Sequence, residues 1–197
     1  MDDLWKKTDY KVDLDQVLWE WDHILSKMSK THWLANQTAL QHSEYCDNIY
    51  KNACGHFSSL GYTRNIKMGK KLAGPRPIQL RYPEIKNESY FNKINPLYEG
   101  TIFEKIINDH GGTRARIMRK AQHTTYSIHR DMSPNGRYHL AMKTNDHAYF
   151  LWPNDKEKHF IRSLQIPADG ALYWVNTYKM HTFINCGADR LHLVFNK

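Results

Sequence analysis

Residues 114–150 read RARIMRKAQHTTYSIHRDMSPNGRYHLAMKTNDHAYF, and residues 172–195 read LYWVNTYKMHTFINCGADRLHLVF. Short runs rich in β-branched, aromatic and aliphatic residues, such as RARIMR, ALYWV and DRLHLVF, are typical of strands. The groups QHTT, SPNG, PND and PADG separate these runs and are turn signals. This alternation predicts that the C-terminal half of the chain is built mainly from short strands joined by turns.

Helical patterns come before these strands. Apolar residues recur at helical spacing over residues 14–28, behind a start at Asp13 and Gln16 that resembles a capping box. A less regular pattern predicts a second helix in part of 37–54. The stretch TIFEKIINDHGG, residues 101–112, predicts a third helix, with a capping box at its start and two glycines at its end.

The order of these elements predicts the fold class. Helices followed by strands favour a mainly β protein with a double-stranded β-helix (jelly roll, cupin-like) core and N-terminal α-helices. We expect one domain over residues 1–197, in which 1–111 form a helical and loop region and 112–197 form the jelly-roll core. Residues 61–100 show little periodicity and are predicted to be long loops with short strands, either a substrate lid or an insertion.

The chemistry is carried by three residues. His129 and Asp131 form a His-x-Asp pair, and His181 follows about fifty residues later in KMHTFIN. Residues two apart on an extended strand point to the same face, so His129 and Asp131 can chelate one ion together. Two imidazoles and one carboxylate on one face of Fe(II) leave positions open for a cosubstrate and O2. His129, Asp131 and His181 are therefore predicted to be metal ligands and catalytic residues.

These motifs together resemble the aspartyl/asparaginyl β-hydroxylase family of Fe(II)- and 2-oxoglutarate-dependent dioxygenases. The resemblance covers residues 112–197 and also rests on Arg-x-His after the first histidine, Thr-Asn, a tryptophan before the second histidine, and Arg-x-His-Leu near the end: Arg137, His139, Thr144, Asn145, Trp174, Arg190 and His192. Asp131 fills a position that animal members leave without an acidic residue. The chain therefore resembles the microbial branch, with a complete triad.

Roles follow from the resemblance by position. It implies that Fe(II) is the metal, that Arg190 pairs with the distal carboxylate of 2-oxoglutarate, and that Arg137 and His139 lie near the chelating end of this cosubstrate. The upstream hydroxyl residue that some members use for the distal carboxylate has no clear match here. Trp174 is expected to be core or pocket wall, and the remaining histidines, His123, His147, His159 and His192, to be structural or exposed.

The resemblance implies hydroxylation of an unactivated C–H bond, with an aspartyl or asparaginyl residue, an amino acid, a peptide or a protein as substrate. Other readings of the same residues remain. A histidine on a strand is often structural, Arg190 can be a surface residue, and Arg137 and His139 can simply open a strand after the SPNG turn. A jelly-roll module that binds a ligand or nucleic acid beside a vestigial metal site is the main alternative. A hydrolase or isomerase using Zn(II) or Mn(II) is another.

Composition limits the class of protein. The 197 residues, 41% hydrophobic, suffice for one substantial core, and no apolar run is long enough to span a bilayer. The N-terminus lacks the apolar stretch of a signal peptide, so a cytoplasmic location is expected. Three cysteines without a C-x-x-C motif indicate neither a disulfide framework nor a zinc knuckle.

The net charge of +8 has two interpretations. The basic residues are scattered, with their densest clusters at residues 68–81 and in TRARIMRK, which favours a solvated surface. The alternative is an acidic ligand drawn to a positive cleft, 2-oxoglutarate included. Nucleic acid is the less favoured partner because no long basic run is present.

Overall fold

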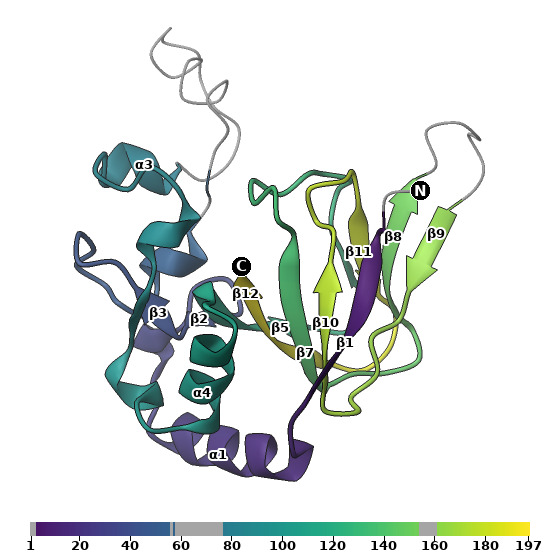
Figure 1. Ribbon diagram of the computed structural model, residues 1–197, viewed down its shortest axis with the longest axis horizontal. Coiled ribbons are helices and arrows are strands. Elements are labelled where there is room, and N and C mark those ends of the chain that lie inside the picture. The colour runs from purple at the N-terminus through teal and green to yellow at the C-terminus, as the bar shows by residue number, and fades with distance from the viewer. Residues whose placement is uncertain (1–2, 56, 58–76, 154–160) are drawn as a thin grey trace, which may run out of the picture.

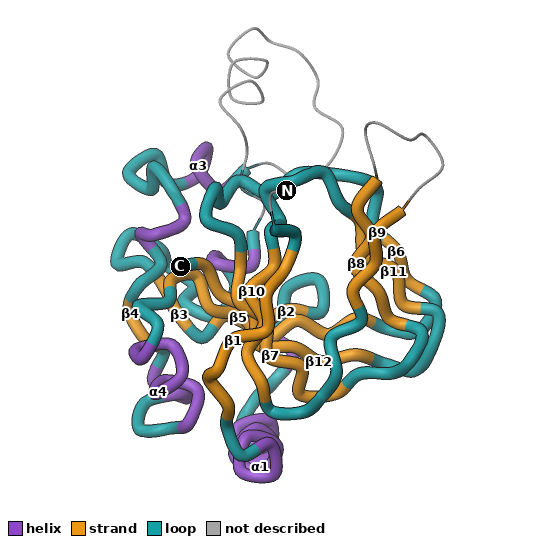
Figure 2. Tube along the Cα trace, turned by 45° about the vertical axis from the view of Figure 1, so that its right-hand side comes forward, coloured by secondary structure: helices purple, strands orange, loops and turns teal. Residues whose placement is uncertain are grey.

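Two antiparallel sheets form the core of the protein in a computed structural model, which describes residues 3–55, 57, 77–153 and 161–197. The larger sheet has six strands in the order β1-β10-β7-β12-β5-β2, and the smaller has four in the order β6-β11-β8-β9. Figures 1 and 2 show the two sheets side by side, with helices at the other side of the larger one. The predicted fold class, a mainly β double-stranded β-helix with flanking helices, is confirmed.

The elements have the following bounds in chain order. They are β1 (Trp5–Lys11), α1 (Leu14–Ser26), η1 (Lys30–His32), β2 (Gln37–Ala39), β3 (Gln41–His42), η2 (Asn52–Cys54), α3 (Ile78–Arg81), η3 (Glu88–Tyr90), β4 (Lys93–Ile94), η4 (Pro96–Tyr98), α4 (Ile102–Asp109), β5 (Thr113–Lys120), β6 (Thr124–Thr125), β7 (Arg137–Lys143), β8 (Ala148–Pro153), β9 (Ile161–Leu164), β10 (Ala171–Val175), β11 (Thr182–Asn185) and β12 (Arg190–Asn196).

The larger sheet has two different faces because side chains alternate along each strand. One face packs on α1 and α4, where a buried cluster joins residues of both helices to alternate residues of β5, β7 and β12: Val17, Trp21, Ile24, Phe103, Ile106, Ala115, Ile117, Leu140, Leu193 and Phe195. The opposite face looks toward the smaller sheet and lines a cavity. Burying the first face on the helices thus leaves the second available for a site.

Two of the predicted helices are confirmed. In α1, the Asp13 carboxylate accepts hydrogen bonds from the backbone N–H groups of Asp15 and Gln16, which is an N-cap. The Gln16 side chain donates to Glu20 instead of returning to the cap, so only half of the expected capping box forms. In α4, the Thr101 hydroxyl caps the helix and the Glu104 carboxylate accepts from the N–H of Gly100, one residue before the position a capping box uses.

The predicted helix in residues 37–54 is wrong. This segment holds strands β2 and β3 and the single turn η2. Strand β2 pairs with β5 and places Thr38 opposite Ile117, which completes one edge of the larger sheet. Two or three residues of strand carry too little alternation to be recognised, and pairing with β5 decides their conformation.

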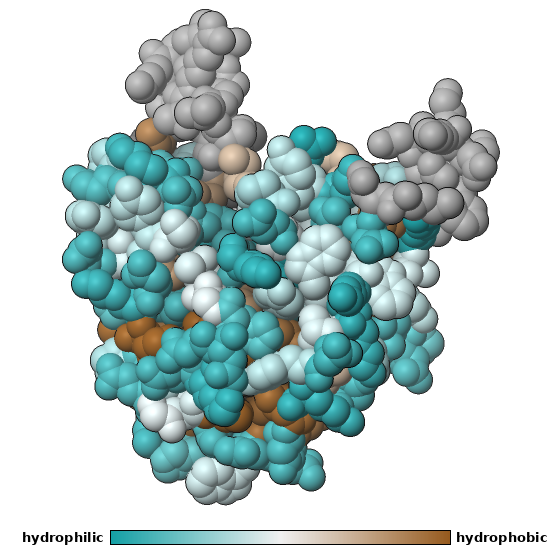
Figure 3. Space-filling model, in the orientation of Figure 1, coloured by the Kyte–Doolittle hydropathy of each residue, from teal (hydrophilic) through white to brown (hydrophobic). Residues whose placement is uncertain are grey.

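Residues 77–100 contain one short strand, β4, in line with the prediction, but also α3 and two single helical turns that the sequence did not predict. The rest of the proposed lid, residues 61–76, lies outside the described residues. The face seen in Figure 3 is mostly hydrophilic, with small hydrophobic areas between polar residues. Within the described residues, no helix is long and apolar enough to cross a membrane.

Candidate metal centre

The three predicted ligands meet at the cavity. His129 and Asp131 lie on the connection between β6 and β7, and His181 immediately precedes β11. The backbones of His129 and His181 form a β-bridge, in which each N–H donates to the other's carbonyl at 2.9 and 2.8 Å. The N–H of Asp131 donates to the carbonyl of Thr177 at 2.9 Å. Main-chain hydrogen bonds therefore hold these positions together, although no continuous strand carries the His-x-Asp pair as predicted.

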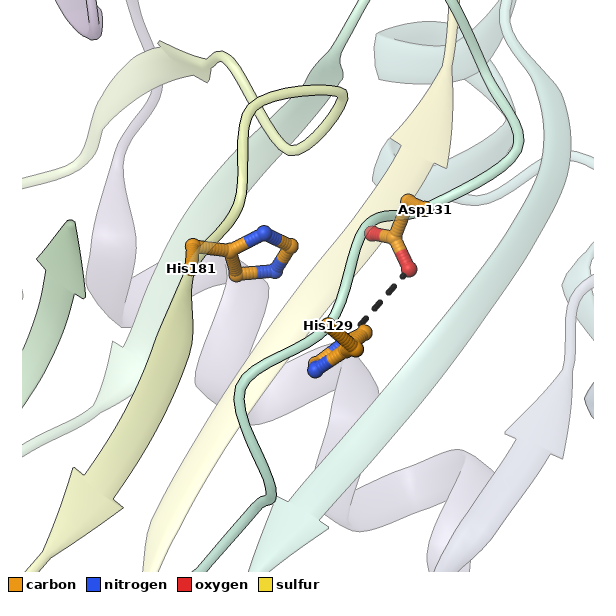
Figure 4. Close-up of side chains that lie close together, drawn as sticks. All are labelled: His129, Asp131 and His181. Atoms are coloured by element: carbon orange, nitrogen blue, oxygen red, sulfur yellow. Dashed lines mark ion pairs between the residues drawn. The ribbon is translucent and has the colours of Figure 1, made fainter. Parts of the chain in front are cut away.

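The side chains converge as well. One ligand atom from each of His129, Asp131 and His181 lies within 4.8 Å of the others. Nε2 of His129 is 3.7 Å from Oδ1 of Asp131, and the two imidazole ring centroids are 4.5 Å apart. Figure 4 shows the three side chains turned toward a common point. This arrangement is suited to a divalent metal ion with part of its coordination sphere left free.

Hydrogen bonds indicate the tautomer of both histidines. Nδ1 of His129 is 2.8 Å from the carbonyl of Ser127, and Nδ1 of His181 is 2.9 Å from that of Lys179. A carbonyl can only accept, so each Nδ1 carries a proton, and in the neutral imidazole this leaves the lone pair on Nε2. Burial also lowers the pKa of His181, which favours its neutral form. Neutral imidazoles oriented by backbone carbonyls are the usual form of metal-binding histidines.

Asp131 is fixed by an arginine. Nη1 of Arg137 is 2.7 Å from Oδ2 of Asp131, while the other oxygen, Oδ1, faces His129. Burial alone would raise the pKa of Asp131, but Arg137 and then the two histidines bring it below its usual range. Arg137 also contacts the buried Glu88 and Asn196. The Asp131 carboxylate is therefore ionised and held in one orientation by Arg137, a contact that the sequence did not reveal.

A cavity of about 740 Å³ lies between the two sheets, next to the three predicted ligands. Its walls come from β5, β7 and β12 of the larger sheet and from Phe150 and Phe183 of the smaller. All six predicted site residues line it: His129, Asp131, Arg137, His139, His181 and Arg190. A volume of this size accommodates a small cosubstrate together with part of a second molecule.

Arg190 is buried in this cavity. Its guanidinium lies 4.2 Å from the ring centroid of Phe183, and Nη2 donates to Nδ1 of His192 at 2.6 Å. His192 is therefore a buried, neutral partner of Arg190, and burial lowers its pKa well below the usual value. Within the described residues Arg190 forms no ion pair with a carboxylate. A buried cation of this kind is suited to an anionic ligand.

His139 is also buried, and its ring lies 5.1 Å from that of Phe150. Neither ring nitrogen has a hydrogen-bond partner within the described part of the chain. Burial, with Arg190 and Arg137 nearby, lowers the pKa of His139 well below its usual value, so the imidazole is neutral. It offers one donor and one acceptor to a ligand in the cavity.

Strand β5 contributes residues that the sequence analysis assigned to a solvated surface. Its alternate residues Arg114, Arg116, Met118 and Lys120 all line the cavity, whereas Ala115 and Ile117 face the helices. Arg114 and Arg116 are buried, so for them the surface interpretation is wrong. The alternation of RARIMRK was visible in the sequence, but which face was buried could not be read from it.

The remaining expected residues lie elsewhere. Trp174 is half-buried outside the cavity lining, and its Nε1 donates to the carbonyl of Asn135, so it is not pocket wall. Asn145 holds the turn before β8 through Asn185 and the carbonyl of Ala188. His123 and His147 are exposed as expected, and His159 lies outside the described residues.

Comparisons with known proteins add the following findings. No protein-family model matches the sequence, and no curated protein matches it either. A solved 2OG-Fe(II) oxygenase-family oxidoreductase from Burkholderia pseudomallei is similar in structure, at 12% identity and a TM-score of 0.35. The match covers 64% of this chain and 60% of the Burkholderia chain, so this chain spans less than two thirds of that protein's length. A prolyl-4-hydroxylase from Pseudomonas putida matches at 12% identity and a TM-score of 0.39, over 73% of this chain and 90% of that one. A Bacillus thuringiensis protein described as IDO matches at 11% identity and a TM-score of 0.44, over 98% of this chain and 89% of that one.

Similarities at this level do not establish an activity. Fold and site together define a double-stranded β-helix protein with a two-histidine, one-carboxylate cluster at the edge of a basic cavity. What the protein does has to be inferred from these residues.

Proposed function

We propose that the protein is an Fe(II)- and 2-oxoglutarate-dependent dioxygenase that hydroxylates an unactivated C–H bond. The main support is the convergence of His129, Asp131 and His181, each with a free ligand atom, beside a cavity that holds the buried Arg190. Neutral imidazoles and an ionised carboxylate are the ligand set of non-haem iron oxygenases.

Iron bound there, with 2-oxoglutarate and O2, would supply the oxidant, one oxygen atom entering the product while 2-oxoglutarate is converted to succinate and CO2. The chain's own residues bind and orient the reactants. In this proposal Arg190 pairs with the distal carboxylate of 2-oxoglutarate. His139 and Arg137 lie toward the chelating end, where the neutral His139 can donate one hydrogen bond. Phe150 and Phe183 keep water away from this part of the cavity.

For the substrate we retain an aspartyl or asparaginyl residue, or a related amino acid, peptide or protein, on the basis of the motif resemblance. The basic cavity lining favours an acidic group on that substrate. We propose a cytoplasmic location, supported by three free thiols at Cys46, Cys54 and Cys186.

The test is an anaerobic titration of the Fe(II)-loaded protein with 2-oxoglutarate, followed by the weak visible charge-transfer band of the chelate. We expect the band in the wild type and its loss in Asp131→Ala. Asp146→Ala is the matched control, because Asp146 is exposed and does not line the cavity. If Fe(II) binds but 2-oxoglutarate produces no band in the wild type, the dioxygenase proposal fails. A ligand-binding module or an enzyme using another metal would then be the better explanation.

A further inference from the structure

Arg116, in the middle of β5, has an unusual environment. Its side chain lines the cavity but the residue is only 4% exposed. Nε and Nη2 have no hydrogen-bond partner within the described residues, and Nη1 reaches only the side-chain oxygen of Gln37, at 3.5 Å. A guanidinium has five N–H donors, and most of these are therefore unpaired.

The two neighbouring arginines are compensated. Arg114 forms an ion pair with Glu88 and donates to the carbonyls of Ala53 and Gly55. Arg137 contacts Glu88 and Asp131. Both buried carboxylates of the cavity lining are thus already occupied by Arg114 and Arg137, and neither forms an ion pair with Arg116.

Leaving this cation unpaired costs folding free energy. Burying a charge without a partner is unfavourable, and the hydrogen bonds lost to water are not replaced. Burial and the nearby Arg137 lower the pKa of Arg116 to about 10, so the side chain is still cationic at neutral pH. The buried, unpaired guanidinium of Arg116 is therefore stabilised when an anion enters the cavity.

In the proposed binding mode Arg190, not Arg116, pairs with the distal carboxylate of 2-oxoglutarate. Arg190 lies opposite Lys120 in the sheet, and Lys120 is four residues from Arg116 along β5. At about 3.3 Å per residue, this separates the backbone positions of Arg116 and Lys120 by roughly 13 Å. The five-carbon chain of 2-oxoglutarate spans roughly 5 Å, given C–C bonds of about 1.5 Å. The two arginines are therefore positioned for two different anionic groups, and a second ligand of the cavity can supply the one at Arg116.

We propose that Arg116 binds an anionic group of the substrate, a carboxylate or a phosphate, and so selects for it. This rests on the proposed function in that the second ligand of the cavity is taken to be the substrate. Charge supports it: the described lining residues include six basic side chains (Arg114, Arg116, Lys120, Arg130, Arg137 and Arg190) and two carboxylates (Glu88 and Asp131). Fe(II) and doubly negative 2-oxoglutarate cancel, so the positive excess is left for the substrate.

The test requires neither iron nor 2-oxoglutarate. In an Arg190→Met background, which removes the other buried arginine that lacks a carboxylate partner, thermal unfolding is followed in acetate, phosphate and chloride at equal ionic strength. Acetate or phosphate should raise the unfolding midpoint above that in chloride, by roughly 5–10 °C near 100 times its Kd. Adding Arg116→Met should abolish this difference. Arg116→Lys, which keeps the charge, should restore part of it and serves as a second variant if Arg116→Met does not fold.

A larger effect of phosphate assigns a phosphate to the site, and a larger effect of acetate assigns a carboxylate. Arg119→Met is the control, because Arg119 lies on the same strand but is exposed and pairs with Asp189. Equal midpoints in all three salts, or an anion effect that persists in Arg116→Met, would overturn the proposal. If the anion effect is present but Fe(II) and 2-oxoglutarate give no charge-transfer band, the dioxygenase proposal fails and the anion site remains.

Discussion

Lys120 on β5 and Arg190 on β12 are direct cross-strand partners, and both line the cavity. Like charges in this position repel each other and destabilise a sheet. Within the described residues neither side chain forms an ion pair with a carboxylate, and the ammonium of Lys120 lies 3.2 Å from the ring centroid of Tyr126. A carboxylate bound between them would relieve the repulsion, and this favours Arg190 as the distal anchor of 2-oxoglutarate.

Replacing Arg190 is expected to weaken 2-oxoglutarate binding. Hydrogen bonds to a charged group contribute about 1.5–3 kcal/mol, so Arg190→Met should raise the Kd of 2-oxoglutarate roughly 10- to 100-fold. Methionine preserves apolar contact with Phe183. Anaerobic titration of the Fe(II) protein measures the Kd, with Arg119→Met as the exposed control. An unchanged Kd in Arg190→Met would rule out this anchor.

Lys120 should make 2-oxoglutarate binding dependent on pH. Burial, with Arg190 nearby, lowers the pKa of Lys120 to about 8. The ammonium is charged below that pH and neutral above it, so affinity for the dianion should fall as the pH rises through about 8. Bound carboxylate favours the charged form and shifts the midpoint upward. Titrations from pH 7 to 9.5 should show this fall in the wild type and a flatter profile in Lys120→Met. Identical profiles would contradict the assignment.

Arg137 should control metal affinity through Asp131. Removing a group that orients a metal ligand typically lowers metal affinity by 10- to 100-fold, and we expect this for Arg137→Gln. The absorption of bound Co(II) measures the affinity. Arg114→Gln is the matched control, because it removes the other arginine partner of Glu88 without touching Asp131. Arg114→Gln should lower the unfolding temperature while leaving Co(II) affinity near that of the wild type. If both variants lose Co(II) affinity equally, the loss comes from disturbing Glu88 and not from the contact between Arg137 and Asp131.

Gly136 should be required for the turn that leads from Asp131 into β7. Its φ is +71°, and an added Cβ would lie 2.6 Å from the carbonyl oxygen of Val175. Gly136→Ala therefore combines left-handed strain, about 1–2 kcal/mol, with a backbone clash. Gly111→Ala is the control, with φ +58° and nothing within 4 Å of its Cβ. Gly111→Ala should lower the unfolding midpoint by a few degrees and Gly136→Ala by clearly more; equal shifts would show that the turn relaxes.

Features that depend on residues close in sequence, such as helix caps and turns, were predictable from the sequence. The Asp13 and Thr101 caps start the two main helices. The turn signals SPNG and PADG directly precede β7 and β10, whereas QHTT contains β6 and is not only a turn. The meeting of His129, Asp131 and His181 was predicted from motif spacing and is confirmed as a geometric fact. Their role as ligands stays a prediction.

Long-range pairing was not predictable from local patterns. Glu88 comes from a region without periodicity, yet it contacts Arg114, Arg137 and Asn196. Arg116 was assigned to the surface because the basic residues are scattered along the chain and form no long run. The smaller sheet and the segment around Cys54 line the same cavity, and neither could be placed against β5 from the sequence. The face of β5 that carries Arg116 becomes buried only when the two sheets have assembled.

The two outer strands of the larger sheet, β1 and β2, come from the first forty residues, whereas the four strands between them lie beyond residue 112. During synthesis the N-terminal strands emerge first and have no partner until β5 and β10 follow. Completion of the sheet is therefore a late step dominated by contacts distant in sequence, which slows folding. A fragment limited to residues 112–197 would expose the edges of β5 and β10 and tend to aggregate, so attempts to isolate the half that carries the three predicted ligands should keep the N-terminal segment.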